Sequence, residues 1–194
     1  MPVTQALLVA NVLVYLLLMG SGLPLMEWFA LWSPSTPLFE PWQIVTYSFL
    51  HAPDSIAHIA FNMFALYTFG ASIERLFGGR FYLLYYFACV VSAAICHLIV
   101  TGLMGGPPIP TVGASGGIYG LLLAYGLYFP NQRVMLLIPP IPMRARTLVI
   151  GFAVLELFFG VTGTVNGVAH FAHLGGMLGG WLMIEYRKRG GGRL

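Results

Sequence analysis

The stretch Gly113-Ala114-Ser115-Gly116-Gly117 sets one serine among small residues at the head of an apolar segment. A second stretch, Ala172-His173-Leu174-Gly175-Gly176, sets a histidine inside a later apolar segment. Polar side chains are costly in hydrocarbon, so a hydroxyl and an imidazole at similar depth in two apolar segments require a functional explanation. The pair predicts a serine hydrolase built inside a membrane.

The composition of the chain is that of a polytopic membrane protein. Its 194 residues are 58% hydrophobic and 8% charged, with a mean hydropathy of +0.83. At about 20 residues per span, the apolar runs predict an all-α bundle of six transmembrane helices. We expect one membrane domain over residues 1–194, with a long outer connection over about 20–46. The predicted helices lie near Thr4–Met19, Ile56–Leu76, Phe81–Leu103, Ser115–Phe129, Thr147–Val161 and Val168–Tyr186.

The basic residues predict the orientation. In a six-helix arrangement all nine fall on one side, which the positive-inside rule makes cytoplasmic. Both termini are then cytoplasmic, and the net charge of +3 reflects topology and indicates no nucleic-acid partner. We predict a multi-pass protein of the prokaryotic cell membrane, in contact with lipid. The nine are Arg75, Arg80, Arg133, Arg144, Arg146, Arg187, Lys188, Arg189 and Arg193.

The first apolar segment, the connection that follows it and the two cysteines each support one further prediction. The start of the chain, residues 1–5, lacks the basic region of a secretory signal, so the first segment is expected to be retained. The tryptophan-rich connection that follows is expected to lie in the outer interface, a solvated loop with aromatic anchors being the alternative. Cys89 and Cys96 lie about 10 Å apart along one helix, too far for a disulfide, and are expected to be free.

A depth count groups the polar side chains. At 1.5 Å per residue, Ser115 lies roughly 24 Å above Asn131, some way below the outer surface of a hydrocarbon core about 30 Å thick. Glu156, at roughly 15 Å above Arg146, is counted near the midplane. His97 falls in the outer layer with Ser115, so depth alone does not choose a site. The other members of this layer are His58, Asn62 and His173.

Local context points to acyl transfer. Ser115 lies at a helix N-terminus among glycines, including Gly113, which lets another backbone approach and leaves N–H groups unpaired. It could attack a carbonyl if His173 took its proton, a helix-capping serine being the alternative. The Ser115 N–H, the His58 imidazole and the Asn62 amide could stabilise the oxyanion. Otherwise, the latter two would be hydrogen-bonding partners between helices.

Two features support the pair. Tyr119 follows Ser115 by one turn and could pack on the His173 imidazole, although a core tyrosine is equally compatible with the pattern. Gly176 and Gly180 follow His173 in a row of small residues that permits tight helix packing. No acidic residue is expected near this layer except Asp54 in a loop, so the sequence predicts a Ser-His dyad without an acid.

Two alternatives use other residues. His170, His173 and His58 could be metal ligands, but there is no HExxH motif and no evident general base for a metal-bound water. Glu156 is an intramembrane acid that the dyad does not use. It could be protonated and hydrogen-bonded within the bundle, or it could serve with the histidines as the proton path of a small transporter.

The residues resemble those of the rhomboid intramembrane serine proteases over nearly the whole chain. The resemblance rests on Gly113-Ala114-Ser115-Gly116 with Tyr119, on Ala172-His173-Leu174-Gly175-Gly176 with Gly180, on His58-Ile59-Ala60-Phe61-Asn62, and on Ile73-Glu74-Arg75 before Phe77-Gly78. It implies a six-helix bundle, Ser115 as nucleophile, His173 rather than His170 as base, and His58 with Asn62 as oxyanion donors. One departure is Trp42-Gln43, where the family often has Trp-Arg.

The resemblance also implies the reaction. Substrates would be single-span membrane proteins cut in or near the membrane beside small residues, at a site open to the outer side. The outer connection would lie partly in the membrane, and the fifth helix would border a lateral substrate entrance. We therefore predict a serine endopeptidase with no cofactor and no metal. The rival hypotheses are the transporter and an inactive relative that binds membrane proteins.

Overall fold

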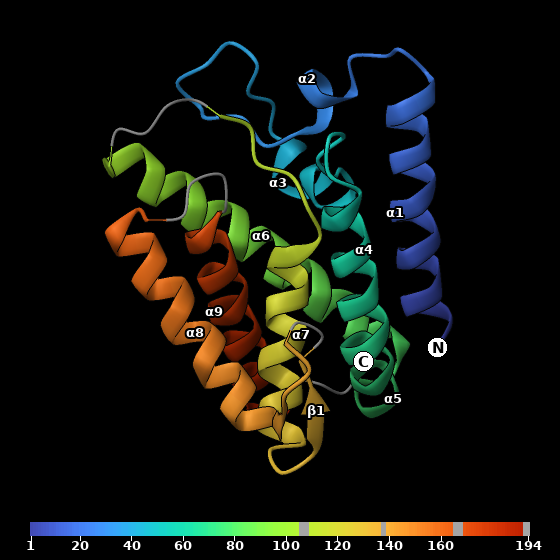
Figure 1. The fold of residues 1–194 in the computed structure, drawn as a ribbon, viewed down its shortest axis with the longest axis vertical. Helices are drawn as coiled ribbons and strands as arrows, with labels where there is room; N and C mark the ends of the chain where they lie inside the picture. The colour runs from blue at the N-terminus through green and yellow to red at the C-terminus, as the bar shows by residue number, and fades with distance from the viewer. Residues whose placement is uncertain (105–108, 137–138, 165–168, 192–194) are drawn as a thin grey trace.

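The computed structural model describes residues 1–104, 109–136, 139–164 and 169–191, and within them the chain is a helical bundle (Figure 1). Its long segments are α1 (Pro2–Gly20), α4 (Ile56–Ala65) continued by the π-turn η2 (Leu66–Gly70) and by α5 (Ala71–Phe77), α6 (Gly79–Met104), α7 (Ser115–Tyr128), α8 (Ala145–Thr162) and α9 (His170–Tyr186). The short elements are α2 (Leu25–Phe29), α3 (Gln43–Thr46), η1 (Tyr47–Phe49), η3 (Arg187–Gly191) and the hairpin strands β1 (Arg133–Met135) and β2 (Pro142–Arg144).

The prediction of an all-α polytopic membrane fold is confirmed. Among the described residues, four segments are long and apolar enough to cross a membrane: Pro2–Gly20, Ile56–Phe77, Gly79–Met104 and Ala145–Thr162. α7 and α9, at 14 and 17 residues, are shorter and lie inside the bundle, where they pack against α6 and each other. The small antiparallel hairpin between α7 and α8 was not predicted, and the predicted start of the last helix at Val168 lies outside the described residues.

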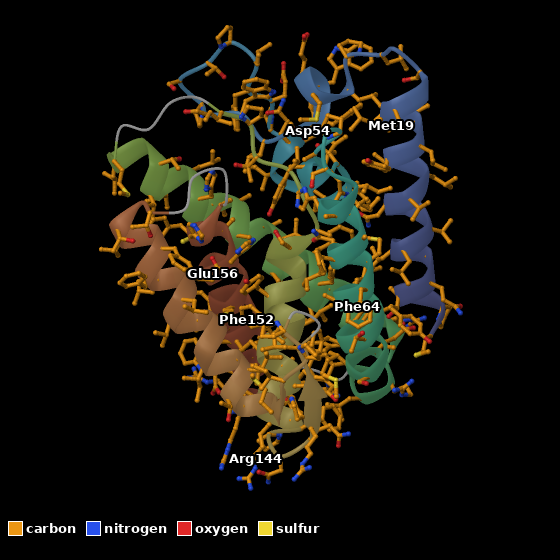
Figure 2. All side chains as sticks on the ribbon, in the orientation of Figure 1. Met19, Asp54, Phe64, Arg144, Phe152 and Glu156 are labelled. Carbon is orange, nitrogen blue, oxygen red and sulfur yellow. The ribbon has the colours of Figure 1, made fainter. Side chains whose placement is uncertain are left out.

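The two ends of the bundle differ in charge. Figure 2 places Met19 and Asp54 at one end and Arg144 at the other. The described basic residues all belong to the elements at the Arg144 end, namely α5, the start of α6, the hairpin, the start of α8 and η3. Arg193 lies outside the described residues. Cys89 and Cys96 are free, as predicted.

A buried carboxylate fastens α1 to the bundle. Glu74 of α5 accepts hydrogen bonds from the Thr4 N–H (2.8 Å), the Thr4 hydroxyl (2.6 Å) and the Val3 N–H (3.1 Å). The first N–H groups of a helix have no acceptor within the helix, and its N-terminus favours negative charge. Glu74, on a neighbouring helix, therefore accepts hydrogen bonds from N–H groups at the start of α1 that have no acceptor within α1.

Gln43 organises the outer connection. Its side chain is fully buried; Nε2 donates to the Leu38 carbonyl oxygen (2.8 Å) and lies 3.3 Å from that of Trp28, while Oε1 accepts from the Trp32 N–H (3.3 Å). An amide can donate and accept at once, which a guanidinium cannot. Gln43 thus anchors the connection by binding the backbone groups of Leu38, Trp28 and Trp32.

α7 and α9 meet backbone to backbone. A methyl group built on Gly176 would lie 1.9 Å from the carbonyl oxygen of Gly116, and one built on Gly180 would lie 3.2 Å from the Cα of Gly120. Real carbon atoms do not approach an oxygen this closely, so only glycine permits this separation. The row of small residues after His173 therefore lies at the contact with α7.

We expect Gly176→Ala to lower the free energy of unfolding by at least about 2 kcal/mol, because the two backbones must separate to admit the methyl group. Thermal unfolding in detergent micelles measures this. Gly151→Ala in α8 is the matched control, since a methyl group there meets open space and alanine favours a helix over glycine by up to about 1 kcal/mol. Equal stability of the two variants would contradict the packing argument.

Candidate functional site

The backbone before Ser115 is held by the outer connection. Leu31 and Thr111 exchange two backbone hydrogen bonds of 3.0 and 2.9 Å, and the Gly113 N–H donates to the Tyr47 carbonyl oxygen at 3.0 Å. Gly113 has φ +125°, which side-chain-bearing residues rarely adopt. This turn starts α7 at Ser115, whose N–H, as the first in the helix, has no acceptor within the helix.

The structure brings Ser115 and His173 together. Ser115 Oγ lies 2.9 Å from His173 Nε2, a hydrogen-bonding distance between two helices 58 residues apart in sequence. The ring of Tyr119 stacks on the imidazole with centroids 4.2 Å apart and planes 5° from parallel. The hydroxyl and the imidazole are therefore placed for proton transfer, and the plane of the imidazole is fixed by Tyr119.

A carboxylate lies on the other side of the imidazole. Glu156 Oε1 of α8 is 2.9 Å from His173 Nδ1, and the same oxygen accepts a short hydrogen bond from the Tyr119 hydroxyl. The second oxygen, Oε2, lies 2.6 Å from His170 Nδ1. The contact with His173 is close but lies off the direction of an ideal Nδ1–H hydrogen bond. Glu156 is thus shared by three side chains from α7 and α9.

The expectation that no acidic residue lies near Ser115 and His173 is wrong. The depth count put Glu156 roughly 9 Å below Ser115, but it compared Cα atoms, whereas the contacts are made by side-chain tips. The imidazole of His173 and the side chain of Glu156 each extend several ångströms and together span this difference. Figure 2 shows Glu156 in the middle of α8, with the end marked by Asp54 above it.

His58 also faces the serine. Its Nδ1 accepts from the Ala52 N–H at 3.2 Å, so the neutral ring carries its proton on Nε2. A methyl group on Gly113 would lie 3.0 Å from this Nε2 and 3.6 Å from Ser115 Oγ, so both atoms border the same small space. Asn62 lies one turn further along α4 and uses one amide N–H on the His58 carbonyl oxygen (2.8 Å), which leaves the second N–H.

The remaining histidines take other positions. His97 Nε2 lies 2.8 Å from the Thr111 hydroxyl. His170 contacts Glu156, and no group of three or more potential metal ligands occurs in the part of the chain that the structure describes. His51, which the sequence analysis did not single out, is fully buried and packs edge-to-face on His58 with centroids 5.1 Å apart. Because it lies in a loop seven residues before His58, it gave no periodic signal.

His51 is buried without satisfied ring nitrogens. Neither nitrogen has a well-formed hydrogen bond among the described residues. Burial, followed by the nearby charge of His58, lowers the pKa of His51 from 6.5 to about 4, although the Phe49 backbone slightly favours the charged form. At neutral pH this ring is therefore an uncharged support for His58.

The class of protein follows from these observations: a membrane-embedded helical bundle with a serine-histidine pair between two internal helices. Comparison with known sequences gives a family of the same class. The profile of the Rhomboid domain matches residues 38–189. The chain is 32% identical over 142 residues to the rhomboid protease GluP of Bacillus subtilis, covering 73% of this chain and 25% of that protein.

The chain belongs to the rhomboid family. It is also 30% identical over 189 residues to the human mitochondrial presenilin-associated rhomboid-like protein, covering 93% of this chain and 47% of the relative. The mitochondrial rhomboid protein 1 of Saccharomyces cerevisiae is 27% identical over 144 residues, covering 66% and 37%. The chain thus spans between a quarter and a half of the length of these relatives. One of these relatives, GluP, is named as a protease, and this chain is an integral membrane protein of the same family.

The burial of His51 predicts a pH-dependent stability. Between pH 6.5 and about 4 the unfolded chain binds a proton that folded His51 does not, so stability falls as pH falls through this window. From pH 7 to pH 4.5 this loss amounts to about 2 to 3 kcal/mol. The loss of stability between the two pH values should be smaller in His51→Phe than in the wild type by this amount, because phenylalanine binds no proton. Thermal unfolding at both pH values measures the difference. Equal losses in the variant and the wild type would contradict it.

Proposed function

We propose that the chain is an intramembrane serine endopeptidase that cleaves single-span membrane proteins in or near their transmembrane segment. The observation that carries the proposal is the 2.9 Å contact between Ser115 Oγ and His173 Nε2 inside an apolar bundle. Membership of the rhomboid family, with relatives named as proteases, supports the reaction type.

The proposed reaction has two stages. Ser115 Oγ attacks the carbonyl carbon of the scissile peptide while its proton passes to His173 Nε2. The C–N bond then breaks, the leaving amine takes that proton, and an ester to Ser115 remains. Water attacks this ester, again giving a proton to Nε2, and the proton returns to Oγ as the ester C–O bond breaks. Both protons move through one nitrogen, and no cofactor takes part.

The tetrahedral intermediates need donors for their oxyanion. The N–H of Ser115 and the Nε2–H of His58 border the space beside Ser115 Oγ, and the second amide N–H of Asn62 completes the proposed set. Gly113 keeps this space open, because any side chain there would contact His58. The donors are held in place before the substrate arrives.

The proposed topology follows from charge. Residues 1–194 would form one membrane domain with the basic end and both termini in the cytoplasm. Ser115 would then lie toward the outer side, where water would reach it, and the exposed rings of Trp28 and Trp42 support a position of the outer connection at the interface. A prokaryotic cell membrane fits this topology and the bacterial relative.

Ser115→Ala and His173→Ala should each abolish cleavage of a membrane-anchored reporter in proteoliposomes, a loss of at least about 10⁴-fold. Ser115→Ala should also lose labelling by a fluorophosphonate. Ser35→Ala, in the exposed outer connection, and His97→Gln are the matched controls, and both should retain cleavage. Retained cleavage in Ser115→Ala would end the proposal. A wild type that is unlabelled but carries a pH-driven solute flux dependent on Glu156 would favour the transporter, and one with neither activity would favour the inactive binding protein.

His58→Ala should lower kcat by about 10²- to 10³-fold with little change in KM, because an oxyanion donor acts mainly in the transition state. Steady-state cleavage of the same reporter measures both constants. An unchanged kcat in a folded His58→Ala protein would remove this imidazole from the proposed set of donors.

A further inference from the structure

The carboxylate of Glu156 is unusually well supplied with donors for a group inside an apolar helix. The Glu156 side chain is 10% exposed, and it contacts His170 Nδ1 at 2.6 Å, His173 Nδ1 at 2.9 Å and the Tyr119 hydroxyl. A buried charge persists only where it is paired and hydrogen-bonded. Because the donors come from α7 and α9, the carboxylate is fixed in both position and rotation.

The contact with His173 has a chemical consequence. A neutral imidazole carries its proton on either nitrogen, and only the Nδ1–H form leaves Nε2 free to accept a proton from Ser115. A carboxylate oxygen 2.9 Å from Nδ1 favours that form. When Nε2 takes the serine proton, the same negative charge stabilises the imidazolium, and it does so strongly in an apolar surrounding.

The other two donors act on the carboxylate. His170 Nδ1 contacts Oε2, whereas His173 contacts Oε1, so His170 orients Glu156 through the oxygen that His173 does not contact. Tyr119 stacks on His173 and donates to Oε1, the oxygen that His173 also contacts. The planar stacking and the shared oxygen therefore fix the imidazole and the carboxylate relative to each other.

We propose that Glu156 is a positioning residue that sets the tautomer of His173 and stabilises its protonated form, so that the reacting pair works as part of a Ser115-His173-Glu156 triad. This inference rests on the proposed function. His170 and Tyr119 hold the carboxylate and do not touch the substrate. The carboxylate itself takes up no proton during the reaction.

The test compares Glu156→Gln with wild type in the full chain, using reporter cleavage and fluorophosphonate labelling. Gln keeps the size of the side chain and removes its charge. In a soluble serine protease the corresponding change, from aspartate to asparagine, lowers kcat by about 10⁴-fold. We expect a fall in kcat of about 10²-fold or more, a nearly unchanged KM and a parallel fall in the labelling rate. Glu156→Asp, which restores the charge, should recover part of the rate.

The amplitude of labelling separates chemistry from folding. If Glu156 served only to hold the fold, the amplitude would fall while the folded fraction reacted at the wild-type rate, and that result would overturn the inference. Glu185→Gln is the matched control: it removes an acid paired with Lys188 at 2.7 Å on the exposed end of α9 and should leave both rates unchanged.

Two further results complete the test. If Glu156→Gln does not fold, the double variant Tyr119→Phe, His170→Leu keeps Glu156 and removes two of its donors, and the labelling rate should fall by about 10-fold. A wild-type rate in this variant, or in folded Glu156→Gln, would overturn the role of Glu156. In both cases an active wild type with an inactive Ser115→Ala leaves the proposed function intact, whereas an unlabelled wild type would remove the proposed function first.

Discussion

The approach of α7 and α9 at two glycines is the constraint on which the site depends. The carbonyl oxygen of Gly116 in α7 lies where a side chain on Gly176 of α9 would begin, so no side chain separates the two backbones at this point. The short side chain of Ser115 can then reach the imidazole of His173 one turn away from this contact. Serine offers only one carbon between its backbone and its oxygen, so a wider helix separation would leave the hydroxyl and the imidazole apart.

Burying a polar group in an apolar bundle is costly unless the group finds a hydrogen-bonding partner, and three buried side chains meet this requirement. Glu74 satisfies the free N–H groups at the start of α1, and Gln43 satisfies backbone groups of the outer connection. Glu156 collects donors from two helices. Glu74 and Glu156 each join different helices, whereas Gln43 joins parts of its own loop, so the same contacts that satisfy hydrogen bonds also define how these segments are arranged.

The sequence predicted the helices and the residues that meet at Ser115 more completely than it predicted the acid. Apolar runs of spanning length and a serine among glycines are local signals, which is why the predicted segment at Ser115–Phe129 differs from α7 by one residue. The contacts of Glu156 were not predicted, because its partners come from two other helices and the contacts depend on how far the side chains extend. His51 and the hairpin between α7 and α8 also lacked a periodic pattern. The roles of Ser115, His173, His58, Asn62 and Tyr119 in catalysis remain predictions.

The backbone hydrogen bonds between Leu31 and Thr111 join the outer connection to the segment that precedes α7. Two hydrogen bonds in opposite directions resist sliding and separation alike, so the outer connection and the turn before α7 move as one piece. Thr111 stands four residues before Ser115, with no helix between them to absorb a displacement. Because Leu31 is buried and paired with Thr111, a displacement of the outer connection at Leu31 would also displace the turn that precedes Ser115.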